Sequence, residues 1–411
     1  MADSIKPPLP NISRRHFIKS ASVATAALAT TPLMAATFGN VASENNATNT
    51  AQPSMTMKQL AEKMEHRHWP KYNDVTVVDA LSLTFDLSKN QFNETTLSQI
   101  ANSGVSAIHA TVTYPGANFE KTVASIAKIK KLIRDHHHVF CEANSIEEIE
   151  KAKHCGKVAV IMGFQSAEML VDSHNEVKFE RIPLFSNLGI RVMQLTYNRR
   201  SPFGDGSLVN ISRGITKLGV QAIEVMEDSN VLVDLSHASK KTIQTSIKHC
   251  KKPIAITHTG CSSIYCHPRN TDDEELRAVA KCGGVVGIYA MPFLAGGTAP
   301  ITADNFIQHI DHAINVCGED HVGIGTDQSL IPVVDDQQYQ ATIKEELKQR
   351  KAAGISAPGE TDERPLYIPD LNHERRMELI AWHLAKKGYK DARIEKVLGA
   401  NFMRLFGEVW S

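Results

Sequence analysis

Short apolar runs recur along the chain from residue 75 onward, and a segment long enough for a helix separates each run from the next. The runs are continuously apolar and rich in β-branched residues, which is typical of strands that are buried on both faces. Eight such runs occur, at residues 75–83, 105–112, 158–164, 192–197, 231–237, 254–259, 283–290 and 322–327.

The segments between the runs have the polarity of helices. Residues 145–156 and 272–283, for example, have acidic side chains near their start and end at a glycine, as amphipathic helices commonly do. Strands that alternate with helices predict a parallel sheet of the α/β class, and eight such units predict a closed (β/α)₈ TIM barrel. A doubly wound open sheet is the alternative that the pattern alone leaves open.

Two regions near the C-terminus depart from this alternation. A polar insertion at about residues 335–372 contains a charged helix over 343–351 and then a loop with Gly and Pro, which suits a cover over the barrel mouth or an oligomer contact. Residues 374–387 and 391–406 are expected to form two closing amphipathic helices. We therefore predict a single barrel domain over residues 71–411.

The first 36 residues have a different character. Arg14 and Arg15 precede an alanine-rich run that is too short and too mildly apolar for a stable membrane span. The pattern resembles a twin-arginine (Tat) signal peptide. We expect residues 1–36 to be removed on export, residues 37–70 to form a flexible lead-in, and the mature protein to be periplasmic without a stable membrane anchor. The Tat export machinery is then a partner; a basic disordered tail is the alternative.

The composition limits the other partners. Lys and Arg total 45 and Asp and Glu total 45, so the chain has no positive field for nucleic acid or an anionic membrane. A small neutral or zwitterionic ligand fits better, and a homodimer is compatible with the sequence. The seven cysteines include no CxxC pair, and we expect mostly buried thiols instead of disulfides.

Candidate chemistry gathers at the carboxyl ends of the predicted strands, where the active sites of TIM barrels lie. The fourth run ends at Tyr197, the fifth at His237 and the eighth at Asp327, and His258 is the penultimate residue of the sixth. Two imidazoles and a carboxylate are suitable zinc ligands that leave a position open for water. We therefore predict a metal site of His237, His258 and Asp327. The alternative for each histidine is a solvated or locally bonded side chain.

Six segments carry a more specific signal. They resemble, in order, successive motifs of the membrane (renal) dipeptidase family, and the similarity runs from about residue 75 to the end of the chain. The segments are LTYNRRSPFGDG (195–206), VLVDLSHAS (231–239), PIAITHTG (253–260), HPRN (267–270), VGIGTD (322–327) and VLGANFMRLF (397–406).

The resemblance implies a metal-dependent, amidohydrolase-like (β/α)₈ barrel that holds two bridged zinc ions and hydrolyses dipeptides. By position, it implies that His237 and His258 hold one zinc ion. Asp327 then lies at the other ion and helps to handle a proton, and Arg269 grips the free carboxylate of the substrate. A planar guanidinium suits that task because it donates two parallel hydrogen bonds. The alternative for Arg269 is a surface salt bridge.

The chain departs from the family pattern where the second zinc ion would bind. Leu81 and Leu83 replace the His-x-Asp pair of the first strand, and Met162 replaces the bridging glutamate of the third. Glu168 would need an altered loop to take that place. Tyr197 replaces the histidine that steadies the tetrahedral intermediate, although a phenol can still donate a hydrogen bond to an oxyanion.

These replacements predict that no binuclear site forms. Two divalent ions about 3.5 Å apart repel each other by roughly 19 kcal/mol at an effective dielectric constant of 20, and the bridging carboxylate offsets that repulsion. We expect one zinc ion (Zn²⁺) at most, with none as the alternative. The first functional hypothesis is a periplasmic metal-dependent dipeptidase that cleaves dipeptides or small peptide-like amides. The second is a noncatalytic or repurposed barrel, such as a binding protein or a maturation factor for a peptide-like product.

Overall fold

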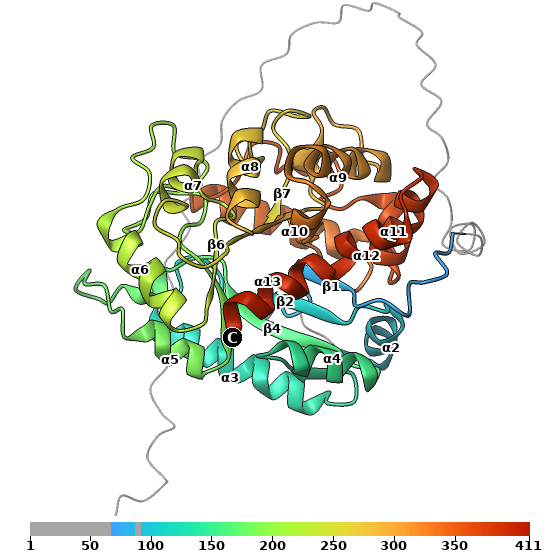
Figure 1. Ribbon diagram of the computed structural model, residues 1–411, viewed down its shortest axis with the longest axis horizontal. Helices are drawn as coiled ribbons and strands as arrows, with labels where there is room; N and C mark the ends of the chain where they lie inside the picture. The colour runs from blue at the N-terminus through green and yellow to red at the C-terminus, as the bar shows by residue number, and fades with distance from the viewer. Residues whose placement is uncertain (1–66, 87–91) are drawn as a thin grey trace, which may run out of the picture. The chain divides into compact units, whose positions relative to one another are not determined.

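Eight strands follow one another in a parallel sheet that is nearly closed (Figure 1). The computed structural model describes residues 67–86 and 92–411. The strands of this path are β1 (Val78–Ser82), β2 (Ala107–Thr111), β4 (Val158–Phe164), β5 (Ile190–Gln194), β6 (Leu232–Asp234), β7 (Ala255–Thr259), β8 (Val285–Ile288) and β9 (Val322–Ile324).

The first and last strands of the path approach each other through a few backbone contacts. Ser82 forms a parallel bridge with Gln328, and the Asp327 amide donates to the Leu81 carbonyl at 3.0 Å. Each of the eight predicted runs overlaps one strand of the path. The predicted TIM barrel is therefore confirmed, and the open-sheet alternative is excluded.

One further strand in the described part of the chain, β3 (Phe140–Glu142), was not predicted. It pairs in parallel with the first residues of β4, with Phe140 opposite Val158. Only Phe140 of its three residues is fully buried. A strand this short and half-exposed gives no continuous apolar run, so the pattern could not reveal it.

Helices connect successive strands, and polar side chains cap many of them. Ser145 accepts a hydrogen bond from the Glu148 amide at the start of α4, and Thr302 and Asn305 form a capping box at the start of α9. The connecting helices are α2 (Glu94–Asn102), α3 (Phe119–Asp135), α4 (Ile146–His154), α5 (Arg181–Asn187), α6 (Lys217–Asp228), α7 (Lys240–Ser246), α8 (Asp273–Lys281) and α9 (Ala303–Cys317).

The amino-terminal end of the barrel is closed by α13 (Asn401–Trp410), the red helix that crosses the strands in Figure 1. Phe402 of this helix belongs to one buried apolar cluster with Ala107 and Ala159, near the starts of β2 and β4. The single helix predicted for residues 391–406 is wrong, because a π-helical turn at Lys396–Ala400 separates α12 (Asp391–Glu395) from α13. Helix α13 leaves the carboxyl end of the barrel uncovered, and the candidate active site lies at that end.

Gly399 explains the break before α13. A Cβ on this glycine would lie 2.2 Å from the Thr76 carbonyl oxygen, so only glycine lets the turn approach β1 so closely.

The polar insertion lies over the carboxyl end of the barrel. Its helix α10 (Gln337–Ala352) begins earlier than predicted. The loop after it reaches the mouth, where Asn198 donates to the Ile355 carbonyl at 2.7 Å and His267 Nε2 bonds the Pro358 carbonyl at 2.8 Å. These contacts agree with the expected cover. Helix α11 (Arg376–Lys386) then follows as predicted.

The seven cysteines all lie in the described range and form no disulfide. Only Cys261 is buried, while Cys155 and Cys266 are exposed, so the expectation of mostly buried thiols is wrong. Across residues 67–86 and 92–411, no helix is long and apolar enough to cross a membrane. The predicted signal peptide and nearly all of the lead-in lie outside the described residues.

Candidate active site

All the predicted site residues lie at the carboxyl end of the barrel. Tyr197 follows β5, His237 follows β6, His258 belongs to β7 and Asp327 follows β9. Arg269 comes from the loop between β7 and α8. The strands thus deliver these side chains to one edge, as the sequence predicts for a parallel barrel.

Two of these residues have an unusual backbone. His237 has φ of 63° and Asp327 has φ of 55°. In the described residues, the other non-glycine residues with positive φ are both asparagines, Asn175 and Asn230. A left-handed conformation costs roughly 1–2 kcal/mol per residue, and such strain clusters at functional sites.

Three aromatic rings from neighbouring strands are in contact at the mouth. The Tyr197 ring stacks on the His237 ring, with centroids 4.0 Å apart and an interplanar angle of 24°. The His237 and His258 rings meet edge to face, with centroids 4.9 Å apart. The structure therefore brings together the two histidines and the tyrosine that the strand ends predicted.

Both histidines present an unprotonated nitrogen. His237 Nδ1 donates to Asn198 Oδ1 at 2.6 Å. His258 Nδ1 donates to Thr257 Oγ1 at 2.9 Å, because the Thr257 hydroxyl itself donates to Asp234 Oδ2 at 2.6 Å. The Nε2 atoms of both rings are buried and have no hydrogen-bond partner in the described structure. Each neutral ring thus carries its lone pair on Nε2.

The charged groups around the mouth favour these neutral rings. Burial first, and then the Arg269 guanidinium, lowers the pKa of His237 and of His258 well below its ordinary value. Arg269 is only 4% exposed, and its Nη2 atom has no partner among the described residues. Burial raises the pKa of Asp327 to about 6, against the opposing effects of Arg269 and Arg350.

A third imidazole, which the sequence analysis missed, lies inside the barrel. His109 on β2 donates from Nδ1 to the Ala80 carbonyl at 2.7 Å, and its Nε2 atom is buried without a partner in the described structure. A Cβ on Gly163 of β4 would lie 2.1 Å from that Nε2 atom, so the imidazole requires glycine there. The sequence did contain a signal for this residue. Side chains alternate along a strand, so His109 lies on the same inner face of β2 as Ala107.

The three positions at which the family has its other metal donors, Leu81, Leu83 and Met162, carry no metal-binding atom on this side of the mouth. Leu81 is fully buried, and Leu83 follows it at the end of β1. Side chains alternate along a strand, so Met162 lies on the opposite face of β4 from Gly163 and His109. There its Cε atom lies close to Gly189. These residues do not fit a bridged pair of metal ions.

The donors that remain fit one metal ion at most. His237 and His258 are neutral, their rings are adjacent, and the Nδ1 atom of each is held by a neighbouring oxygen, as is usual for histidines that bind a metal. Among residues 67–86 and 92–411, however, no group of three or more His, Cys, Asp or Glu side chains is placed to hold a metal ion. The structure does not join Asp327 to the two imidazoles as a three-donor set.

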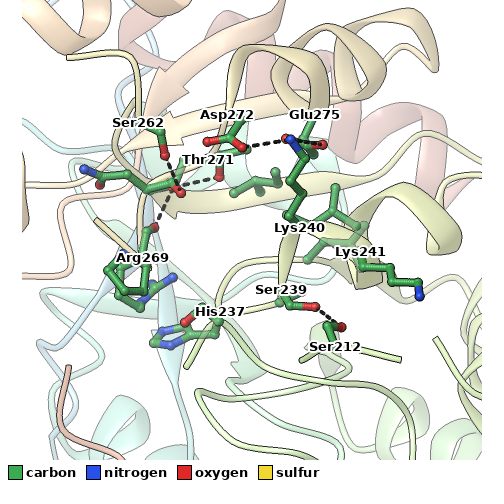
Figure 2. Close-up of a pocket in the computed structure, with 18 of the residues that line it drawn as sticks. Ser212, His237, Ser239, Lys240, Lys241, Ser262, Arg269, Thr271, Asp272 and Glu275 are labelled. Atoms are coloured by element: carbon green, nitrogen blue, oxygen red, sulfur yellow. Dashed lines mark hydrogen bonds and ion pairs between the residues drawn. The ribbon is translucent and has the colours of Figure 1, made fainter. Parts of the chain in front are cut away.

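A pocket of about 570 Å³ is lined by two of the site residues, His237 and Arg269 (Figure 2). Figure 2 shows His237 and Arg269 close together on one side of it. On another side, Lys240 reaches Asp272 at 3.0 Å and Glu275 at 3.9 Å. Pockets of this size accommodate small-molecule ligands.

The insertion adds one more side chain that sequence reasoning missed. Arg350 of α10 donates from Nη1 to the Tyr197 hydroxyl at 3.2 Å, and its other nitrogens bond the Glu360 carboxylate. The residue pair is separated by 153 positions. No local pattern signals the contact, because it depends on how the insertion folds back over the mouth.

Solved structures and curated relatives of this chain agree with the geometry. An amidohydrolase from Pseudomonas aeruginosa is 28% identical, with a TM-score of 0.71 over 82% of this chain and 98% of that one. A metallo peptidase from Rhodobacter sphaeroides, solved with a phosphinate mimic of the dipeptide L-Ala-D-Ala, is 17% identical and shares the fold, with a TM-score of 0.65 over 82% of this chain and 99% of that one.

The sequence relatives give the family. An uncharacterized dipeptidase of Schizosaccharomyces pombe is 29% identical over 245 residues, which are 56% of each chain, so the match spans about half the length of that relative. The model of the membrane dipeptidase family, peptidase family M19, matches residues 56–357. The resemblance seen in the six motifs is confirmed, and the chain belongs to the membrane dipeptidase family.

Proposed function

We propose that this protein is a peptide hydrolase that cleaves dipeptides or small peptide-like amides at the barrel mouth. The observation that carries the proposal is the pair of buried, unpartnered Nε2 atoms of His237 and His258, which lie beside a guanidinium with a free donor, that of Arg269. Unpaired buried polar atoms are costly unless a ligand satisfies them. Membership of the family gives the class of ligand.

The residues of the mouth can divide the work of hydrolysis. Arg269 would bind the substrate carboxylate through its free Nη2 atom. Asp327, whose pKa burial raises to about 6, is mostly ionised at neutral pH and would accept a proton from the attacking water. Tyr197 would donate a hydrogen bond to the oxygen that becomes negative in the tetrahedral intermediate.

His237 and His258 would hold a single metal ion, for which zinc is the family's element and the best match to nitrogen donors. When bound, such an ion supplies a water of lowered pKa. We further propose that the protein works in the periplasm after export by the Tat route. That proposal is supported by Arg14, Arg15 and the apolar run that follows them.

Metal content and turnover, measured on the purified mature protein, test the proposal together. We expect about one zinc per chain and hydrolysis of dipeptides, including dipeptides with a C-terminal D-residue. Two ions per chain would contradict the loss of the bridged site. Absence of both metal and hydrolysis would overturn the hydrolase.

A second function is favoured by the replacements on the other side of the mouth. Leu81, Leu83 and Met162 remove the donors of one whole ion, so the barrel could bind a peptide-like ligand without cleaving it, or act in the maturation of one. Binding of a dipeptide by the metal-free protein, measured by calorimetry, with the dipeptide recovered intact, would support this function.

A further inference from the structure

Tyr197 is held at one face of its ring and at its hydroxyl. One face stacks on the His237 ring, with centroids 4.0 Å apart, and the Arg350 guanidinium lies over the ring at 5.9 Å from its centroid. The hydroxyl bonds Arg350 Nη1 at 3.2 Å. The tyrosine is therefore fixed by a residue of the insertion as well as by the barrel.

Arg350 in turn has a fixed orientation. Its Nε and Nη2 atoms donate to the two oxygens of Glu360, at 2.9 and 2.8 Å, and Ser356 donates to the same carboxylate at 3.0 Å. The Glu360 side chain is only 6% exposed. Two parallel bonds of this kind hold a guanidinium in one plane.

The direction of the bond to Tyr197 follows from its chemistry. A guanidinium has donors and no acceptor, so Arg350 donates and the phenol oxygen accepts. The phenol proton is thus not used in this bond and remains free to donate elsewhere. An ordinary phenol has a pKa of about 10, so this proton is present near neutral pH.

We propose that Arg350 is a positioning residue, which the insertion contributes to hold the Tyr197 hydroxyl as the donor to the substrate oxyanion. This inference rests on the proposed hydrolysis. The cation behind the phenol makes its proton a stronger donor as negative charge develops on the substrate. The insertion then has a role in the chemistry as well as covering the mouth.

A merely structural role predicts a different result. If Arg350 only fastened the insertion to the barrel, its removal would lower stability and substrate affinity by the same factor whether or not the Tyr197 hydroxyl was present. A double-mutant cycle separates the two roles because it measures their coupling. The paired change R350M/E360Q is used so that no buried carboxylate is left unpaired.

The cycle compares wild type, Y197F, R350M/E360Q and the triple variant, with K351M as a control on the exposed side of the same helix. The readouts are kcat and KM for a dipeptide, the Kd of a tetrahedral phosphinate dipeptide mimic, and Tm. We expect Y197F to lower kcat on the order of 10²-fold, with KM changed less than about threefold. R350M/E360Q should lower kcat roughly 10-fold in the wild type but less than about twofold in the Y197F background.

Equal losses from R350M/E360Q in both backgrounds would overturn the inference, as would an equal loss in K351M. If the wild type binds the mimic without any hydrolysis, and the losses in Kd are still coupled, the hydrolase proposal fails while the pairing of Arg350 with Tyr197 stands. A wild type that neither binds the mimic nor hydrolyses dipeptides would overturn both.

Discussion

The two sides of the barrel mouth differ in the residues at the family's metal-donor positions. On the side of β6 and β7, His237 and His258 remain, with both Nε2 atoms buried and unpartnered in the described structure. On the side of β1 and β4, the corresponding donor positions are Leu81, Leu83 and Met162. One side presents two unpartnered imidazole nitrogens, and the other has apolar side chains at all three family donor positions.

The supporting hydrogen bonds differ less than the donors. Asp234 and Thr257 still hold His258 on one side. On the other side, Asp79 still joins β1 to β9, since it accepts from the Thr326 amide at 2.8 Å and from its hydroxyl at 2.5 Å. Leucine and methionine at the family donor positions are therefore compatible with an intact strand-to-strand framework.

The largest effect is expected where the donors remain. His237→Ala should abolish metal binding and lower kcat/KM by at least about 10³-fold, because the ion would lose one of its two nitrogen ligands. Elemental analysis and a dipeptide hydrolysis assay measure the two effects. His174→Ala, which changes a histidine with an 82% exposed side chain, is the matched control. Unchanged metal content in His237→Ala would contradict the assignment of the metal site to the side of β6 and β7.

Restoring a family donor on the apolar side should harm the protein. Met162→Glu places a carboxylate at a fully buried position among apolar neighbours, which we expect to lower the free energy of unfolding by about 3 kcal/mol. Urea denaturation measures this, with Ile211→Glu at an 84% exposed position as the control. A Met162→Glu variant as stable as the wild type would contradict the apolar surroundings that the structure gives this side chain.

Binding of the substrate carboxylate by Arg269 should depend on the shape of the side chain as well as on its charge. Arg269→Met should raise KM on the order of 30-fold with a smaller change in kcat, and Arg269→Lys should recover only part of the loss, because an ammonium cannot donate in a planar fork. Steady-state kinetics with dipeptides and with their C-terminal amides measure the effect. Arg277→Met changes an arginine whose side chain is 55% exposed and serves as the control. Equal activity on the amides would argue against the grip.

The smallest effect concerns the framework carboxylate. Burial raises the pKa of Asp79 to about 7, although Thr326 and Arg376 oppose the shift, whereas an unfolded Asp has a pKa of about 3.9. The native state thus binds this proton more tightly, so the stabilisation is complete below about pH 4 and is lost as pH rises through about 7. Between about pH 4 and 7, the free energy of unfolding should therefore fall less in Asp79→Asn than in the wild type, by on the order of 2 kcal/mol. Denaturation curves at several pH values measure this difference. An identical pH profile in the variant would contradict this.

The sequence predicted the barrel because each strand is a continuous apolar run and each helix has its own end signals. It missed β3, whose three residues give no such run. It also missed the turn at Gly399, which depends on contact with Thr76, a residue just before β1 and far away in the sequence. Local patterns determine local elements, and contacts across the fold cannot be read from them.

The same division holds for the site. His237, His258, Asp327 and Tyr197 were predictable because a parallel barrel brings its strand ends to one edge. Arg350 was not, since the path of a polar insertion has no periodicity to follow. The sequence also could not show whether Asp327 joins the two imidazoles as a third metal donor, because that depends on side-chain directions.

The left-handed backbone at His237 and Asp327 has a consequence for which residues these two positions can keep. A glycine at either position would relieve roughly 1 kcal/mol of strain, so drift in a disused barrel would tend to replace both side chains and make the protein more stable. This chain instead tolerates the weaker backbone at both strand ends. Such strain is what we expect at two positions where the side chain matters more than the stability of the backbone.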